Sequence, residues 1–216
     1  MVICIKAHKI AYMAVPKAAC SSVKAALCAI DPEARIPKSK IKDRVDELHI
    51  QYPTKRFRLH RWKLYEDHWR FTVIRDPLKR LLSVYSDRKE QKRDLFRSPR
   101  LRESTLPDDP DPDFFFEHLQ EYFSHSSVIK HHLLPASIFI GPDLTRYDNI
   151  YRVEDLGQLA EDISNRINAP ISIPRLNKST YKLSFDDLSP KAKAVIRKHL
   201  ESDYTLLSRY YSKRSS

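Results

Sequence analysis

The sequence predicts an α/β fold with three layers, α/β/α, in which helices cover both faces of a mostly parallel central sheet. Two short apolar segments, residues 9–15 and 71–74, each end at a proline-containing turn and are followed by a helical pattern. Strands that alternate with helices in this way are typical of a parallel sheet. The 216 residues suffice for one sizeable core, and no repeat or linker divides them, so we expect a single domain over residues 1–216.

The first strand–helix unit lies at the beginning of the chain. Residues 9–15 predict a buried strand that stops at Pro16, because proline cannot donate a hydrogen bond to a β-ladder. Ser21 or Ser22 can cap the helix that follows and continues to Ile30. A strand, a tight loop and a helix in this order aim backbone N–H groups and the positive helix end at an anion.

The second unit repeats this arrangement. Residues 71–74 predict a short β-branched strand, which is broken at Arg75, Asp76 and Pro77. A helix then begins with Pro77 in its first turn, where the missing N–H group costs nothing. Its apolar stripe has helical spacing and consists of Leu78, Leu81, Leu82 and Tyr85.

The rest of the chain continues the alternation of strands and helices. The expected elements are a loop at 98–113, a helix at 114–123, strands at 137–140 and 149–153, a helix at 156–167, a polar connector at 176–183, and one or two closing helices at 190–210.

The composition excludes a disordered or membrane-spanning chain. Hydrophobic residues make up 41% and charged residues 31%, and no apolar run approaches the ~18 residues of a spanning helix. The net charge of +11 is concentrated in two runs, with ten Lys/Arg against three Asp/Glu over residues 35–63 and seven against two over 88–102. Such runs are typical of solvated surface, but they also suit an anionic substrate.

Cysteine and histidine usage favours a reducing compartment without a metal. None of the three cysteines stands in a CxxC pair, so we expect reduced thiols and a cytoplasmic protein. The N-terminal segment lacks the apolar core of a signal peptide. His125, His131 and His132 have no Cys or carboxylate partner at ligand spacing, so no metal site is expected. The sequence leaves the oligomeric state open.

Glycine usage restricts the kind of nucleotide site. The chain contains only two glycines, Gly141 and Gly157, so neither a GxGxxG nor a GxxxxGK[ST] loop exists. A phosphate cradle must therefore be built from other small residues. Residues 16–22, Pro-Lys-Ala-Ala-Cys-Ser-Ser, offer a cation, three small residues and two hydroxyl donors, although an ordinary strand-to-helix turn could look the same. The predicted anion-binding residues are Lys17, Ala18, Ala19, Cys20, Ser21 and Ser22.

The second turn adds a guanidinium and a hydroxyl. Arg75 ends the predicted strand, and Ser83 lies eight residues later, in the second turn of the helix. A guanidinium beside a hydroxyl is a good fork for a phosphate monoester. The simpler alternative is that Arg75 pairs with Asp76 or with a helix carboxylate.

Taken together, the two turns resemble the nucleotide-binding motifs of the sulfotransferase superfamily. Residues 71–85, FTVIRDPLKRLLSVY, resemble its strand–loop–helix for the 3′-phosphate, and residues 15–22, VPKAACSS, resemble its 5′-phosphosulfate loop. Ala-Cys in place of Gly-Gly is similar to the Golgi carbohydrate sulfotransferases, as are residues 147–156, 176–179 and 199–210. Those enzymes carry a membrane anchor before the first motif, which this sequence lacks, so the resemblance favours a bacterial-type cytoplasmic member.

The resemblance implies a nucleotide-kinase-like sulfotransferase fold and a defined reaction. The donor would be 3′-phosphoadenosine 5′-phosphosulfate, the product adenosine 3′,5′-bisphosphate, and the acceptor a hydroxyl, with a carbohydrate favoured. Lys17 would neutralise charge on the leaving oxygen, and Arg75 and Ser83 would hold the 3′-phosphate. The resemblance also implies a loop that closes over the nucleotide, formed by Asn177, Lys178 and Ser179; a polar surface connector is the alternative.

The acceptor hydroxyl needs a base, for which a neutral histidine is suited. We predict His60, which precedes the strand ending at Arg75, as a catalytic histidine does in some heparan-type sulfotransferases. A short strand there would bring it to the same sheet edge. Arg58 and Arg61 beside it would recruit an anionic acceptor, and His132 is the second candidate. A surface histidine in a basic stretch is the alternative for His60.

Two other functions compete with sulfuryl transfer. A phosphotransferase on a related fold would need the missing GxxxxGK[ST] loop and a strand-end carboxylate for magnesium. A basic nucleic-acid-binding module is supported by the charge of +11 alone, and no recognised binding motif accompanies it, so no nucleic-acid partner is expected.

Overall fold

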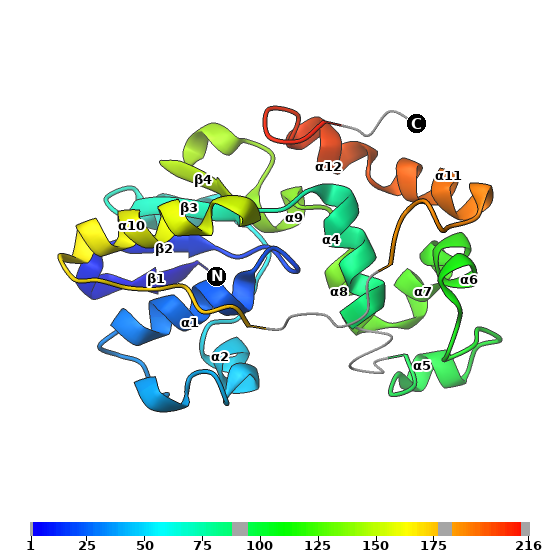
Figure 1. Cartoon of the computed structure of the whole chain (residues 1–216), viewed down its shortest axis with the longest axis horizontal. Helices are drawn as coiled ribbons and strands as arrows, with labels where there is room; N and C mark the ends of the chain where they lie inside the picture. Colours follow the sequence, from blue (N-terminus) through cyan, green and yellow to red (C-terminus); the bar gives the residue numbers. More distant parts are fainter. Residues whose placement is uncertain (1, 88–94, 177–182, 213–216) are drawn as a thin grey trace. The chain divides into compact units, whose positions relative to one another are not determined.

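The computed structural model describes residues 2–87, 95–176 and 183–212. They form two compact units (Figure 1). The first comprises Met1–Arg75 and Ala136–Lys178, and the second comprises Asp76–Pro135 and Ser179–Ser216. Each unit therefore combines segments that are distant in the sequence. The expectation of a single domain over residues 1–216 stays a prediction.

The first unit is built on a four-stranded sheet in the order β1-β2-β3-β4 (Figure 1). Strands β2 (Ile10–Met13), β3 (Trp69–Ile74) and β4 (Asn149–Arg152) are parallel, with Tyr12 opposite Phe71 and Val73 opposite Tyr151. The mostly parallel sheet of an α/β fold is thus confirmed. Strand β1 (Ile3–Ile5), which the sequence did not predict, is antiparallel to β2.

One face of this sheet carries the main core of the first unit. Tyr12 stacks on Phe71 with ring centroids 4.9 Å apart, and Phe71 meets Tyr151 edge-on at 6.1 Å. Helices α1 (Cys20–Ile30) and α10 (Leu156–Ile167) contribute buried apolar side chains to the same core. Helix α10 has the predicted bounds, and its amphipathic pattern explains why it packs on this apolar face.

The opposite face is also covered. All four residues of β2 are buried, although successive side chains of a strand point to opposite faces. Thr72 donates its hydroxyl to the Met13 carbonyl at 2.8 Å, and the Arg70 guanidinium lies over the Trp62 ring at 5.9 Å. The segment that contains Trp62 therefore lies against this face of the sheet.

Short helices complete the first unit. They are η1 (Lys6–His8), η2 (Lys38–Lys40), α2 (Val45–Gln51), α3 (Leu59–Trp62), η3 (Lys63–Tyr65), α9 (Ser137–Ile140), η5 (Leu144–Arg146) and η6 (Val153–Asp155). Residues 137–140 are thus helical, and the strand predicted there is wrong. This apolar run of four residues fits either structure, and the turn is closed by a hydrogen bond of 2.8 Å from the Gly141 amide to the Ser137 carbonyl.

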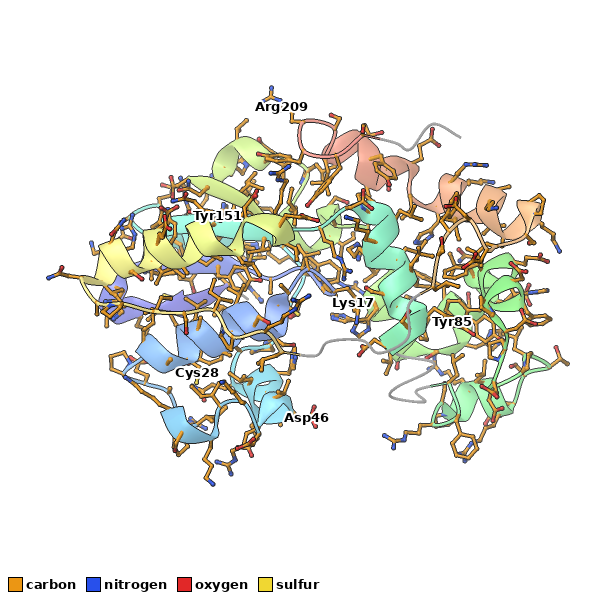
Figure 2. All side chains as sticks on the ribbon, viewed as in Figure 1. Lys17, Cys28, Asp46, Tyr85, Tyr151 and Arg209 are labelled. Carbon is orange, nitrogen blue, oxygen red and sulfur yellow. The ribbon has the colours of Figure 1, made fainter. Side chains whose placement is uncertain are left out.

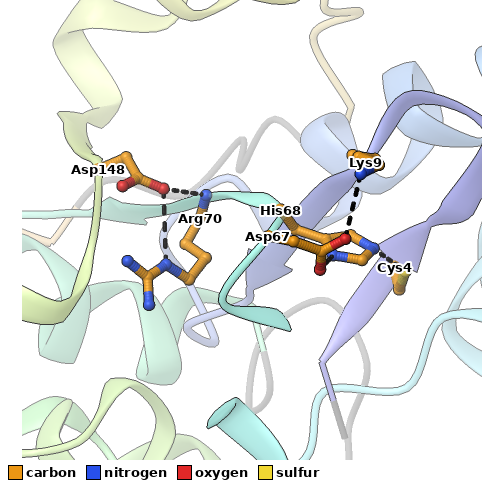
Figure 3. Close-up of polar contacts among 6 residues, drawn as sticks. All are labelled: Cys4, Lys9, Asp67, His68, Arg70 and Asp148. Atoms are coloured by element: carbon orange, nitrogen blue, oxygen red, sulfur yellow. Dashed lines mark hydrogen bonds and ion pairs between the residues drawn. The ribbon is translucent and has the colours of Figure 1, made fainter. Parts of the chain in front are cut away.

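Polar contacts link the residues that precede β2 and β3 to each other and to β1 (Figure 3). The Cys4 thiol lies 3.5 Å from His68 Nε2, whose other ring nitrogen lies 2.7 Å from Asp67. Lys9 pairs with Asp67 at 3.2 Å. Burial raises the pKa of the Cys4 thiol, so the thiolate is disfavoured at this edge. These contacts lie at the sheet edge away from Pro16 and Arg75, which follow the carboxyl ends of β2 and β3.

The described part of the second unit is helical. Its helices are α4 (Pro77–Val84), α5 (Pro99–Arg102), α6 (Pro112–Glu117), α7 (Leu119–His125), α8 (Ser127–Leu133), α11 (Pro190–His199) and α12 (Glu201–Leu206). The expected loop at 98–113 contains α5, and the helix expected at 114–123 is divided at His118 into α6 and α7. Helix α4 begins at Pro77 as predicted, and the two closing helices are confirmed.

A buried ion pair joins α4 to α12 inside the second unit. Arg80 donates to the Asp203 carboxylate at 2.9 Å, and both side chains are only 3% exposed. Arg80 also donates to the carbonyls of His132 and Leu134. Among residues 2–87, 95–176 and 183–212, every helix is too short or too polar to cross a bilayer.

Candidate functional site

The turn that follows β2 has the backbone of an anion cradle. Lys17 and Ala19 adopt left-handed conformations with φ of 65° and 55°. Left-handed residues next to right-handed ones turn successive N–H groups toward one concave side, which suits an anion. Such conformations cost energy in residues other than glycine, and they concentrate at functional sites. Figure 2 labels Lys17 in this turn.

Helix α1 begins directly after the turn. Its N-cap is Ala19, without a side-chain cap, so the capping role predicted for Ser21 or Ser22 is wrong. The first intrahelical bond runs from the Val23 amide to the Ala19 carbonyl at 3.1 Å. The N–H groups of residues 20–22 therefore point out of the positive helix end. The amide of Ala18, in contrast, donates to the Val15 carbonyl at 3.3 Å within the turn.

The second predicted motif meets the first through Arg75. Strands β2 and β3 are parallel neighbours, so their carboxyl ends lie at the same sheet edge. From there Arg75 Nη1 donates to the Lys17 carbonyl at 3.1 Å. The Arg75 side chain and the backbone of Lys17, 58 residues apart in sequence, thus meet at the turn before α1.

The remaining predicted residues of the 3′-phosphate motif lie in the second unit. Ser83 donates its hydroxyl to the Arg80 carbonyl at 2.7 Å, one turn earlier in α4. The Asp76 carboxylate caps α4 by accepting from the Lys79 amide at 2.8 Å. The pairing of Ser83 with Arg75 stays a prediction.

The predicted acceptor residues of the first unit lie around α3. His60 is exposed in this helix, so the short strand expected around it is wrong. Within the part of the chain that the structure describes, its ring makes no hydrogen bond or ion pair. Arg58 and Arg61, however, line a small pocket together with Trp62 and Met13. The second candidate base, His132, lies in α8 of the other unit, with Nδ1 2.8 Å from the Val128 carbonyl.

The loop predicted to close over the nucleotide lies outside the described residues, since Asn177, Lys178 and Ser179 fall between 176 and 183. The chain immediately before it reaches the site. The Leu176 amide donates to the Ser22 hydroxyl at 3.1 Å, across 154 residues of sequence.

Two residues of the site were missed by sequence reasoning. His49 of α2 lies between α1 side chains, with Nε2 2.9 Å from the Ser21 hydroxyl and Nδ1 3.0 Å from Lys24 Nζ. Lys24 is fully buried and donates to the Thr54 hydroxyl at 2.8 Å. A lysine inside the alanine-rich helical run at 23–27 was the one signal available in the sequence.

Comparison with known proteins identifies the family. The Sulfotransferase family matches residues 1–213, which is nearly the whole chain and includes both units. The chain belongs to the sulfotransferase family. Searches among curated proteins and among solved structures found no match.

Membership in the family confirms the predicted resemblance. The protein is a sulfotransferase, a transferase that moves a sulfuryl group to an acceptor, and its mixed α/β sheet agrees with the sulfotransferase fold. The phosphotransferase alternative loses its support, and the absence of a nucleic-acid partner stays a prediction. Among the described residues, no group of three or more His, Cys, Asp or Glu is arranged to hold a metal ion.

Proposed function

We propose that this sulfotransferase takes its sulfuryl group from 3′-phosphoadenosine 5′-phosphosulfate and transfers it to a hydroxyl of a carbohydrate. The hydrogen bond from Arg75 to the Lys17 carbonyl is the observation that carries the proposal. It joins the two turns that resemble the family's phosphate-binding motifs and brings the Arg75 guanidinium to the turn that contains Lys17, next to a helix N-terminus. The proposed cytoplasmic location is supported by the three free thiols of Cys4, Cys20 and Cys28.

The residues around α1 suit the two ends of such a donor. Lys17, the outward-pointing amides of residues 20–22 and the hydroxyls of Ser21 and Ser22 would hold the 5′-phosphosulfate. Arg75, together with Ser83, would hold the 3′-phosphate. The small residues Ala18, Ala19 and Cys20 would allow the donor phosphate to approach the backbone closely. The proposed donor-binding residues also include Asn177, Lys178 and Ser179 of the loop.

The proposed chemistry relies on position and charge. The donor supplies the sulfuryl group, which moves in line from the 5′-phosphate oxygen to the acceptor oxygen, by analogy with phosphoryl transfer. Lys17 would stabilise the negative charge that develops on the leaving oxygen. A sulfuryl group carries less negative charge than a phosphoryl group, so the proposal assigns this task to Lys17 and the helix end, without a metal.

For the acceptor side we propose His60 as the base, with Arg58 and Arg61 recruiting an anionic carbohydrate. The exposed positions of His60, Arg58 and Arg61 around α3 support this assignment. His60→Ala is expected to lower kcat by ~10²-fold, because proton abstraction contributes that much to turnover. Steady-state rates with labelled donor and a panel of carbohydrates measure the effect. If His60→Ala keeps its activity and His132→Ala loses it, the base is His132.

The donor assignment is tested by binding. Arg75→Ala is expected to weaken the binding of adenosine 3′,5′-bisphosphate by ~1.5–3 kcal/mol, which is the contribution of a hydrogen bond to a charged group. Its affinity for adenosine 5′-phosphate should fall less, because that ligand lacks the 3′-phosphate and is affected only through the lost hydrogen bond from Arg75 to the Lys17 carbonyl. Calorimetry measures both, with Arg35→Ala, an exposed arginine, as the control for the lost charge. Equal affinity of the unmodified protein for the two nucleotides would contradict the assignment of Arg75.

A further inference from the structure

A buried lysine lies beneath the start of α1, on the same helix face as Ser21. Lys24 follows Ser21 by three residues, and the spacing of an α-helix places both on one side. His49 of α2 contacts both, at 2.9 Å from the Ser21 hydroxyl and at 3.0 Å from Lys24 Nζ. The three side chains therefore form a hydrogen-bonded row from the interior of the first unit to the first turn of α1.

Lys24, at the buried end of the row, determines which group donates in each of its hydrogen bonds. An ammonium group has only donors, so Lys24 donates to Nδ1 of His49, as it donates to the Thr54 hydroxyl. With Nδ1 as acceptor, the ring carries its proton on Nε2 and donates it to the Ser21 hydroxyl. A doubly protonated ring could not accept from Lys24, and its charge would oppose the ammonium. Lys24 thus selects one neutral tautomer of His49.

The outer end of the row lies in the proposed phosphosulfate loop. Because the Ser21 oxygen accepts from His49, the hydroxyl directs its own proton to a different acceptor. A hydroxyl that accepts a hydrogen bond also becomes a stronger donor. A phosphate or sulfuryl oxygen at the start of α1 is an acceptor suited to it.

We infer that Lys24 is a positioning residue of the sulfotransferase site: through His49 it orients the Ser21 hydroxyl as a donor to the 5′-phosphosulfate. This inference rests on the proposed function of the α1 turn. Both ring nitrogens of His49 are engaged in hydrogen bonds within the row, so the geometry assigns this histidine to orientation and leaves proton abstraction to another group.

The energetics of Lys24 support a role other than stability. Its side chain is fully buried, and no described carboxylate lies within ion-pair distance of it. Burial lowers the pKa of Lys24, since removal from water disfavours the ammonium, and Cys20 opposes this to a smaller extent. A buried cation without an anionic partner usually costs stability, and an apolar side chain of similar shape would avoid that cost.

Nucleotide binding to variants tests the inference. Lys24→Met is expected to lower the affinity for adenosine 3′,5′-bisphosphate ~10-fold or more, the loss of one hydrogen bond to a charged group. Its affinity for adenosine 3′-phosphate, which lacks the 5′-phosphate, should stay unchanged. The melting temperature of Lys24→Met should equal or exceed that of the unmodified protein. If Lys24 had only a structural role, Lys24→Met would lower the melting temperature and would weaken the binding of both nucleotides equally.

Two substitutions of His49 separate the ends of the row. Glutamine reaches the position of Nε2 and can donate to Ser21 without help from Lys24, whereas asparagine reaches only the position of Nδ1. His49→Gln should therefore retain the affinity for the bisphosphate. The double variant His49→Gln, Lys24→Met should recover the affinity that Lys24→Met loses. His49→Asn should lose as much bisphosphate affinity as Lys24→Met does. If Lys24→Met fails to fold, the two single variants still test the contact from His49 to Ser21 on which the role of Lys24 depends, and equal bisphosphate affinity in His49→Asn and His49→Gln would overturn that role.

The outcomes distinguish this inference from the proposed function. If the unmodified protein does not bind the bisphosphate, the proposed donor itself is wrong and Lys24 loses its assigned role. If the unmodified protein binds the bisphosphate, and Lys24→Met and His49→Asn bind it as tightly as the unmodified protein does, the proposed donor stands and the positioning role of Lys24 is overturned.

Discussion

Replacing Lys17 by alanine is expected to lower kcat by ~10²–10³-fold while the affinity for adenosine 3′,5′-bisphosphate changes far less. The turn before α1 holds Lys17 at the sheet edge where the Arg75 guanidinium also lies. A cation aimed at the oxygen that leaves with the 5′-phosphate matters most when that oxygen gains its charge, so its loss is felt mainly in the transition state. Steady-state rates and calorimetry with the same protein separate the two effects.

Lys9 offers a matched control for this experiment. It is also a lysine with a left-handed backbone, with φ of 48°, but it precedes β2 and pairs with Asp67 at the opposite sheet edge. Lys9→Ala removes the same charge from the same backbone conformation and should leave kcat unchanged. Normal kcat in Lys17→Ala together with a raised KM for the donor would show that Lys17 is a binding group and not a catalytic one.

The parts of the fold that the sequence predicted are those with a strong local pattern. Helix α4 begins at Pro77 and α10 spans Leu156–Ile167 as expected, because a proline start and a regular apolar stripe specify a helix locally. Strands β2 and β3 end at the turns that their prolines indicate. These same elements position Lys17 and Arg75, which explains why both residues could be identified from the motifs.

The parts that were missed depend on tertiary contacts. Strand β1 has three residues and exists only through its pairing with β2, which no local pattern reveals. At 137–140 an apolar run of four residues fits both a strand and a helix. Residues 59–62 likewise form a helix whose Trp62 ring receives the Arg70 guanidinium. In each case a contact with another element accompanies the conformation, as the hydrogen bond of 2.8 Å from the Phe57 amide to the Ile138 carbonyl does for residues 137–140.

The same reason explains the missed part of the site. His49 contacts Ser21 and Lys24 across 28 and 25 residues, and only the fold shows that the three side chains meet. The sequence alone also does not show whether a basic residue of a motif binds a ligand or forms a buried ion pair. Arg75 lies at the proposed binding turn, whereas Arg80, five residues later in the same motif, is buried against Asp203.

Breaking the buried ion pair between Arg80 and Asp203 is therefore expected to have the largest effect on stability. Asp203→Ala is expected to lower the free energy of unfolding by ~3–5 kcal/mol, because it leaves the buried guanidinium of Arg80 without its carboxylate. The carbonyls of His132 and Leu134 would still accept from Arg80, but neither neutralises its charge. Urea unfolding of the full chain, followed by circular dichroism, measures the change.

Two further variants show whether the uncompensated charge is the cause. The double variant Asp203→Ala, Arg80→Met removes both charges and should recover much of the lost stability, since an apolar replacement of a buried pair is often nearly neutral. Asp155→Ala breaks an ion pair with Arg152 that is about half exposed, and surface pairs contribute little, so its effect should be small. A double variant as unstable as Asp203→Ala would show that the packing between α4 and α12, and not the charge of Arg80, sets the cost.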